Sequence, residues 1–208
     1  MKRILDITPP LSASLAVWPG DTPLRREILL DLERGDNITL STLHATVHLG
    51  AHADGHNHIG KGAAGIDGRP LEDYLGPCQV IRIPVPRRGV IRPQDLGAVV
   101  SEERVLLATG TFPNPDCFND DFAALAPVLV DHLHDRGVRL IGIDTPSVDP
   151  FDSKDLPAHH RFLACDMAIL EGLQLADVPV GRYELIALPL RLAGFDASPV
   201  RAILRTLQ

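Results

Sequence analysis

The chain has 208 residues, of which 45% are hydrophobic and 23% are charged. These are ordinary values for a globular protein, and they exclude wholesale disorder. The 20 Lys and Arg residues against 27 Asp and Glu residues give a net charge of −7. Such an acidic chain would repel a phosphate backbone, so the composition argues against a nucleic-acid partner and leaves a small-molecule substrate open.

Predicted strands are spread along the whole chain. The candidate stretches are residues 3–8, 38–48, 79–85, 105–109, 138–143 and 185–189. The first is short and rich in β-branched residues, and the second is long with apolar residues at period two. The other stretches are compact apolar runs next to turn residues, which is typical of buried strands.

The clearest helical pattern covers residues 121–136. Its apolar positions at helical spacing are Phe122, Leu125, Val128, Leu129 and Leu133. Gly137 follows as a candidate for the helix end, and Pro127 lies inside the pattern, so the helix begins there or is kinked. Residues 93–99 are a candidate short helix, and residues 167–175 fit either type of element.

The order of these elements is strands, then a helix, then strands again. Strict alternation of strands and helices is absent, so we expect a mixed-sheet α/β or α+β fold rather than a doubly wound one. No repeat or low-complexity tract occurs, and glycine and proline are spread throughout, which predicts a single domain over residues 1–208. No GxGxxG or GxxxxGK[ST] motif supports nucleotide binding.

The cysteines and the hydropathy pattern indicate a cytoplasmic protein. The three cysteines are Cys78, Cys117 and Cys165. They are far apart and odd in number, so a reducing compartment fits better than a disulfide framework. Asp6 and Pro9 interrupt the apolar stretch that a signal peptide would need. No run of about 18 apolar residues occurs, so we expect no transmembrane helix.

A cluster of histidines is the strongest chemical signal in the sequence. Five of the nine histidines lie within fifteen residues: His44, His48, His52, His56 and His58. Asp54 lies among them, and imidazole and carboxylate are the usual ligands of zinc and related divalent ions. A solvated histidine-rich loop is the alternative, but so many histidines around two glycines favour a metal site.

The spacing of the cluster restricts its local structure. Residues four apart in a strand are roughly 13 Å apart, too far for His48 and His52 to share one ion, whereas a helical turn brings them to about 6 Å. Gly50 and Gly55 permit sharp turns. We therefore expect a strand through His48 that breaks at Gly50, followed by a turn that folds His52 and Asp54 back toward His48. Two nitrogens and one oxygen would leave room for water, as in catalytic sites.

A second patch, residues 157–161, contains His159 and His160, and Glu171 follows twelve residues after His159. Alone, the pair is explained by a surface loop and a glutamate at a helix end. Together with the first cluster, it can supply two further metal ligands. His132 and His134 are flanked by acidic residues on the predicted helix, so we expect them on a solvated face.

Residues 48–58 (HLGAHADGHNH) resemble the HxGTHxDxPxH signature of the metal-dependent cyclase family, and more narrowly its kynurenine formamidase (arylformamidase) branch. Four further segments are similar to the family pattern: residues 18–21 (WPGD), 142–149 (GIDTPSVD), 159–173 (H-x11-E-G-L) and 194–201 (GFDASPVR). The resemblance therefore covers nearly the whole chain.

Two positions depart from the signature. Ala51 replaces the usual threonine, as the formamidase branch also allows, and His56 replaces the usual proline. The spare imidazole of His56 is either an accessory ligand or, as we expect, a solvent-facing loop residue. The spacing to Glu171 favours His159 over His160 as the matching histidine.

The resemblance implies a site for two divalent metal ions, usually zinc. The implied ligands are His48, His52 and Asp54 for the first ion and Asp54, His159 and Glu171 for the second. The resemblance also implies that His58 is the general acid/base just outside the metal ligands and that Trp18 lines the substrate pocket. The family fold is a compact mixed α/β domain of the swivelling β/β/α type, commonly found as a homodimer.

The implied activity is hydrolysis of N-formyl-L-kynurenine to L-kynurenine and formate in tryptophan catabolism. A metal ion can activate water and polarise the formyl oxygen, and His58 can supply the proton that the aniline leaving group needs. Within the family, another amide or cyclic-amide hydrolase, such as an isatin hydrolase, is the closest alternative. A metal-binding protein without catalysis is a less favoured alternative from another class.

Other catalytic classes find little support. No GxSxG nucleophile elbow occurs, and the isolated cysteines argue against a structural zinc domain. Cys165 is expected to be a buried structural thiol rather than a nucleophile. Asp144 and Asp149 are interpreted as turn or hydrogen-bonding residues outside the site.

Overall fold

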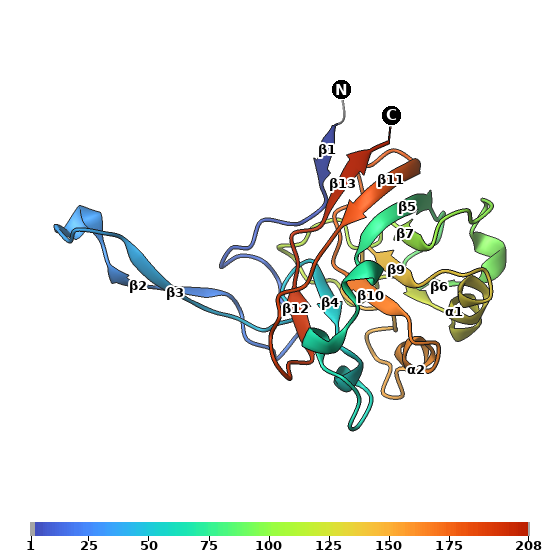
Figure 1. Ribbon diagram of the computed structural model, residues 1–208, viewed down its shortest axis with the longest axis horizontal. Coiled ribbons are helices and arrows are strands. Elements are labelled where there is room, and N and C mark those ends of the chain that lie inside the picture. The colour runs from blue at the N-terminus through green and yellow to red at the C-terminus, as the bar shows by residue number, and fades with distance from the viewer. Residues whose placement is uncertain (1–2, 208) are drawn as a thin grey trace.

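The computed structural model describes residues 3–207, and these residues form a mixed α/β fold around a large curled sheet (Figure 1). The order of strands in this nine-stranded sheet is β1 (Ile4–Asp6), β13 (Ile203–Thr206), β11 (Gly181–Ile186), β5 (Leu75–Arg82), β7 (Arg104–Ala108), β9 (Leu140–Ile143), β10 (Ala168–Glu171), β4 (His52–Asp54) and β12 (Ala197–Pro199). The four central strands β5, β7, β9 and β10 are parallel, and the flanking pairs are antiparallel. The predicted mixed-sheet α/β class is confirmed.

Two small sheets and two helices complete the described fold. The hairpin of β2 (Arg25–Leu30) and β3 (Leu40–His44) extends away from the rest of the molecule, and β6 (Val90–Ile91) pairs with β8 (Ala124–Leu125) (Figure 1). The helices are α1 (Pro127–His134) and α2 (Pro157–Ala164). Short 3-10 turns cover Leu32–Arg34, His56–His58, Ile66–Gly68, Leu71–Asp73 and Pro93–Asp95. No helix in residues 3–207 has the length and apolar character needed to span a bilayer.

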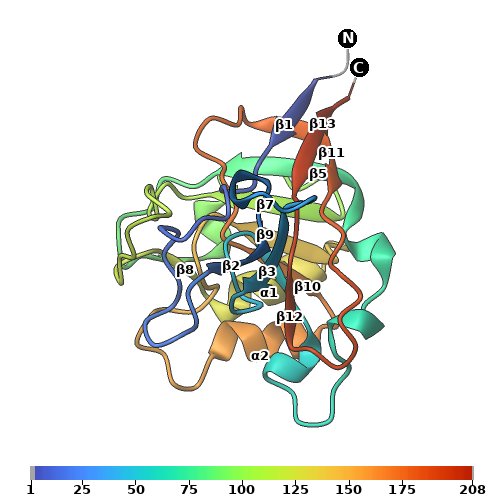
Figure 2. The same ribbon diagram turned by 90° about the vertical axis from the view of Figure 1, so that its left-hand side faces the viewer.

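Alternating side chains in the central strands bury both faces of the sheet. In β7, Val105 and Leu107 pack on the same face as α1 and α2, whereas Leu106 and Ala108 pack on the opposite face. The second face is closed by strands from the curled ends of the sheet, where β1 and β13 lie side by side (Figure 2). Because strands buried on both faces are apolar throughout, they were the easiest elements to predict from sequence.

The predicted strands at 3–8, 79–85, 105–109 and 138–143 correspond to β1, β5, β7 and β9. Of residues 185–189, only the first two belong to β11, and the ambiguous stretch 167–175 contains β10. The predicted helix at 121–136 is shorter than its apolar pattern and starts at Pro127, where the missing amide is harmless. The predicted strand at 38–48 ends at His44, so the interpretation of a strand through His48 is wrong.

Candidate metal-binding active site

Pairing between β4 and β10 brings together side chains that are more than a hundred residues apart in sequence. His52 lies directly opposite Glu171 in the antiparallel register, and Asp54 is two residues further along the same face of β4. His52 Nε2 is 3.1 Å from Glu171 Oε2 and 3.6 Å from Asp54 Oδ1. The alternate residues Ala51 and Ala53 pack into the opposite core. The polar side chains therefore share the face of the sheet that the helices cover.

The conformation of residues 52–54 corrects a prediction from the sequence. We expected a turn that folds His52 and Asp54 back, but these residues form a short strand, and their proximity comes from the period-two alternation of that strand. The sharp bend lies earlier, at Gly50, which has a positive φ of 60°. Gly172 must be glycine at this place because a Cβ there would lie 2.2 Å from the Gly50 carbonyl oxygen.

Helix α2 adds His159 to the group from the other side. His159 Nε2 is 3.5 Å from Asp54 Oδ2 and 3.5 Å from Glu171 Oε1. The His159 Nδ1–H donates to Asp149 Oδ2 at 2.7 Å, and Asp149 also accepts the backbone amides of Ala158 and His159. Asp149 thus takes the place of a capping residue for α2 and fixes which ring nitrogen faces the site.

Asp149 was interpreted from sequence as a turn or hydrogen-bonding residue outside the site. It is a hydrogen-bonding residue, but its partner is the ring of His159, so it belongs to the support of the site. Burial alone would raise the pKa of Asp149, but the hydrogen bonds from the His159 ring and the backbone amides outweigh burial and lower it. The sequence signal available was the segment GIDTPSVD, in which Asp149 is the last residue.

Two more histidines lie on turns at the solvent side. His48 Nδ1 is 3.3 Å from Asp54 Oδ1, and its Nε2 is 3.0 Å from Asp196 Oδ2. The ring of His58 lies 4.5 Å from the ring of His48 between centroids, and its Nδ1 is 3.6 Å from Asp196 Oδ2. Asp196, which sequence reasoning did not single out, precedes β12, and pairing of β12 with β4 brings it here.

The structure brings together all the sequence-predicted ligands, namely His48, His52, Asp54, His159 and Glu171, with His58 beside them. His160, by contrast, is exposed on α2 and makes no side-chain hydrogen bond to a described residue. His56 is not the solvent-facing loop residue that we expected, because its side chain is mostly buried and bonded to Arg69 and Met167. His44 lies on the β2–β3 hairpin next to Glu27 and away from the site.

The buried acceptor atoms of this cluster favour a positive charge at its centre. His52 Nε2 and both carboxylate oxygens of Asp54 are buried without a hydrogen-bond partner. Burial opposes a charged His48, but the carboxylates of Asp54 and Asp196 outweigh burial and raise its pKa to about 9. Burial likewise opposes a charged His159, but Asp149 and Asp54 raise its pKa to about 10.

The same competition applies to the carboxylate at the centre. Burial would raise the pKa of Asp54, but contacts with His159, His48 and His52 hold it well below its usual range. His52 Nδ1–H donates to the Gly50 carbonyl at 2.9 Å, so in the neutral ring the Nε2 lone pair faces the carboxylates. Buried acceptors that face one another without protons are stabilised by a cation, and these N and O donors fit a divalent metal ion.

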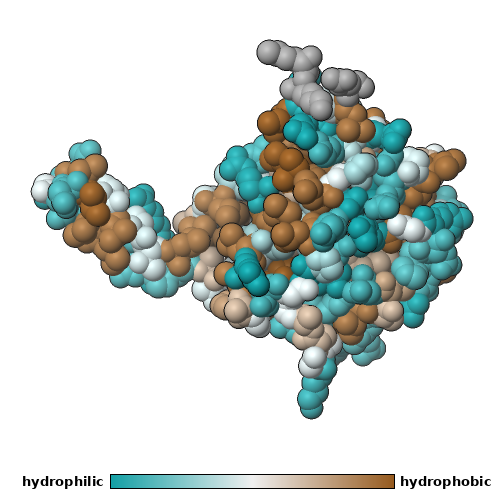
Figure 3. All heavy atoms as spheres, viewed as in Figure 1, coloured by the Kyte–Doolittle hydropathy of each residue, from teal (hydrophilic) through white to brown (hydrophobic). Residues whose placement is uncertain are grey.

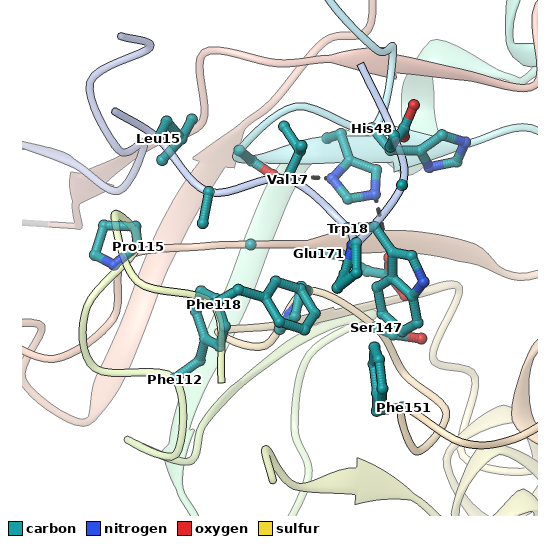
Figure 4. Close-up of a pocket in the computed structure, with 18 of the residues that line it drawn as sticks. Leu15, Val17, Trp18, His48, Phe112, Pro115, Phe118, Ser147, Phe151 and Glu171 are labelled. Carbon is teal, nitrogen blue, oxygen red and sulfur yellow. Dashed lines mark hydrogen bonds and ion pairs between the residues drawn. The ribbon is translucent and has the colours of Figure 1, made fainter. Parts of the chain in front are cut away.

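The cluster lies at one side of a cavity of about 580 Å³ with a largely aromatic and apolar wall (Figure 4). Trp18 lines this cavity, and its ring centroid is 5.0 Å from Phe151 and 5.5 Å from Phe118. His58, His159 and Glu171 also line it. A cavity of this size, with one polar wall of metal-binding type, fits a small aromatic ligand.

Comparisons with known proteins identify the family of this chain. The Cyclase family model matches residues 5–150, and the chain belongs to this family. A kynurenine formamidase of Bordetella petrii is 47% identical over 209 residues and covers the whole of both chains.

Solved structures share the same fold. A potential metal-dependent hydrolase with cyclase activity superposes with a TM-score of 0.85 at 28% identity, covering 100% of both chains. Isatin hydrolase A from Labrenzia aggregata has a TM-score of 0.83 at 21% identity, covering 100% of this chain and 94% of its own.

Proposed function

We propose that this protein is a metal-dependent amidohydrolase that converts N-formyl-L-kynurenine to L-kynurenine and formate. The observation that carries the proposal is the buried group of unpartnered donor atoms on His52 and Asp54, facing an aromatic cavity. The full-length similarity to a kynurenine formamidase supports the choice of substrate. Residues 1–208 would act as one domain, since the main sheet includes strands from both ends of the chain.

The proposed ligand set is that of two divalent ions, for which zinc is our first choice. His48, His52 and Asp54 would hold one ion, and Asp54, His159 and Glu171 would hold the other. Such ions supply a Lewis acid that polarises the formyl oxygen and makes water a nucleophile near neutral pH. The side chains that would bind them are already held from behind: the Gly50 carbonyl orients His52, and Asp149 orients His159.

The remaining side chains would position the substrate and move protons. Trp18, Phe118 and Phe151 offer faces and edges to the aryl ring and exclude water from that part of the cavity. The departing aniline nitrogen needs a proton, and His58 lines the cavity beside the proposed ligands. Imidazole is the most common general acid in enzymes, so His58 is our candidate for this transfer.

A direct assay tests the proposed reaction. The purified protein should hydrolyse N-formyl-L-kynurenine, followed by the change in absorbance as kynurenine forms. A chelator should abolish turnover, and zinc should restore it, while manganese and cobalt provide comparisons of metal identity. A parallel assay with isatin distinguishes the proposed activity from that of an isatin hydrolase, because isatin hydrolase A shares the fold. Turnover of isatin alone, or full turnover without metal, would overturn the proposal.

We also propose that the protein is a cytoplasmic homodimer in which the β2–β3 hairpin contacts the second copy. The three cysteines are free in the structure, and free thiols are compatible with a reducing compartment. The hairpin strands pair only with each other among the described residues, and a lone hairpin is marginally stable in water. The hairpin also exposes large apolar side chains, including Leu29 and Leu43. Hydrophobic surface is visible on this projecting arm in Figure 3.

The hairpin proposal is tested by molar mass in solution. Light scattering after size exclusion should give twice the chain mass for the wild type. Leu43→Glu, placed on the exposed hairpin, should shift the mass toward that of one chain, whereas Val99→Glu, at an exposed apolar position elsewhere, should not. A wild-type mass of 22.6 kDa would exclude the dimer.

A further inference from the structure

Arg69 is a buried cation outside the metal-binding cluster, and its partners come from three separate segments. Its Nη1 donates to His56 Nδ1 at 3.1 Å and to Asp166 Oδ1 at 2.5 Å. Its Nη2 donates to Asp73 Oδ2 at 3.0 Å and to the Asp166 carbonyl at 3.3 Å. Only 4% of the Arg69 side chain is exposed, so its bond to the buried Asp73 is shielded from water, whereas Asp166 reaches it from the surface with 80% of its side chain exposed.

His56 is the partner that connects this cation to the candidate site. Because Arg69 donates to its Nδ1, the ring carries its proton on Nε2, which donates to the Met167 carbonyl at 3.3 Å. Met167 immediately precedes β10, which ends at Glu171. His56 begins the 3-10 turn His56–His58, which we call the His58 turn. The histidine therefore links the turn that carries His58 to the strand that carries Glu171.

The His58 turn has few other anchors. Its capping position is Gly55, which offers no side chain, and His58 itself is exposed, whereas the side chain of His56 is mostly buried. The ring of His58 makes no hydrogen bond to any described residue, so its position depends on the backbone of the turn. Asn57 supplies two anchors, since its Nδ2 donates to the Gly194 carbonyl at 3.1 Å and its backbone amide donates to the Ala64 carbonyl at 3.0 Å. The Gly55 amide, just before the turn, donates to the Asp196 carbonyl at 2.8 Å. His56 supplies the anchor that reaches β10, through the Met167 carbonyl.

We propose that His56 and Arg69 are positioning residues that hold His58 in place for proton transfer. The family signature has proline at position 56, and proline would restrict the first residue of the turn through its ring. In this chain two hydrogen bonds to His56 take over that restriction. The inference rests on the proposed hydrolysis, in which His58 protonates the leaving group.

His56→Ala tests the inference most directly. We expect kcat to fall by about tenfold, less than the about hundredfold cost of a full 1 Å misplacement, because the Asn57 anchors remain. KM and the bound-metal content should stay within twofold of wild type. In a His58→Ala background, His56→Ala should change kcat by less than twofold, because the group that it positions is gone. Equal losses in both backgrounds would overturn the inference.

His56→Pro should restore most of kcat, because proline restricts the turn by a different means. His160→Ala is the matched control, since it removes an exposed histidine on α2 and should change nothing. Asp166→Asn covers the case in which His56→Ala does not fold. Asp166 is exposed and has φ of 52°, which asparagine accepts, so this change weakens the Arg69 anchor without opening the core. It should lower kcat about twofold to threefold in the wild type but not in His58→Ala, as expected for loss of an exposed pair.

A measurement without turnover separates this inference from the proposed function. The ring ¹⁵N signals of His58, identified by their loss in His58→Ala, should shift or broaden in His56→Ala and remain unchanged in His160→Ala. Unchanged His58 signals in His56→Ala would overturn the inference even in an active enzyme. A wild type that fails to hydrolyse N-formyl-L-kynurenine would overturn the proposed function, whereas the ring signals would still report whether His56 positions His58.

Discussion

The candidate site has two halves that differ in burial and in the elements that carry them. The buried half lies on β4, α2 and β10, and the relative exposures of its residues are 3% for His52, 5% for Asp54, 3% for His159 and 3% for Glu171. The open half lies on turns and next to β12, and its side-chain exposures are 20% for His48, 31% for His58 and 47% for Asp196. The first half is built like a core and the second like a surface.

The difference in burial suits the two halves to different tasks, metal binding in the buried half and proton transfer in the open half. Side chains in the buried half have a second anchor behind them, such as the bond from the Val148 amide to Glu171 Oε1 at 2.7 Å. Donor atoms fixed in this way are suited to hold a metal ion without reorganisation. In the open half, His48 and His58 share the partly exposed carboxylate of Asp196. Groups at the solvent side can exchange protons with water between turnovers.

The largest effect is expected from removing the carboxylate at the centre of the buried half. Asp54→Ala should lose most of the bound metal, and its activity should fall by more than the about 10–100-fold that is typical of outer-shell changes. Elemental analysis of the purified variant measures the metal content. Asp177→Ala, which changes an exposed aspartate, is the control and should keep both metal and activity. Unchanged metal content in Asp54→Ala would contradict the shared role of this carboxylate.

The next largest effect is expected in the open half. His58→Ala should keep its bound metal while kcat falls at least about a hundredfold, because a general acid contributes typically 10²–10⁴-fold. Steady-state kinetics and elemental analysis on the same preparation separate the two effects. Full activity in this variant would remove His58 from the mechanism. Loss of metal would mean that His58, like the residues of the buried half, is needed to hold the metal.

A smaller effect is expected from the support behind His159. Asp149→Asn keeps the side-chain shape but weakens the bonds to the ring and to the first amides of α2. Metal affinity should fall about 10–100-fold, as for other outer-shell partners. Titration against a chromogenic chelator measures the affinity, and circular dichroism shows whether α2 is retained. Wild-type affinity would mean that the buried half does not depend on its second anchors.

The buried half also shows the limit of local sequence reasoning. The family pattern named its four residues, but the conformation of residues 52–54 was predicted as a turn, because in a continuous strand His48 and His52 would lie too far apart to share an ion. The register between β4 and β10, which sets His52 opposite Glu171, is a long-range property that no local spacing contains. The apolar strands β7 and β9 were easier to predict from sequence, since burial on both faces leaves a continuous apolar run.

Helix α2 was missed for a related reason. Its capping position is Leu156, in a left-handed conformation and without a side-chain bond, so the sequence lacks the usual start signal. Asp149 supplies the cap from seven residues earlier, across a loop. The role of Asp149 and the start of α2 are thus one feature, and neither is visible until the loop is folded.

The smallest effect is expected from Asp196→Asn, and this variant tests the difference between the buried and the open half most closely. The backbone bond from the Gly55 amide to the Asp196 carbonyl remains, so only the charge beside His48 and His58 is lost. An exposed pair contributes about 0.2–1 kcal/mol, which corresponds to about a 1.4-fold to fivefold loss of activity. Metal content should not change. A loss as large as that of Asp149→Asn would mean that the open half is held as tightly as the buried half, and the division between binding and proton transfer would not hold.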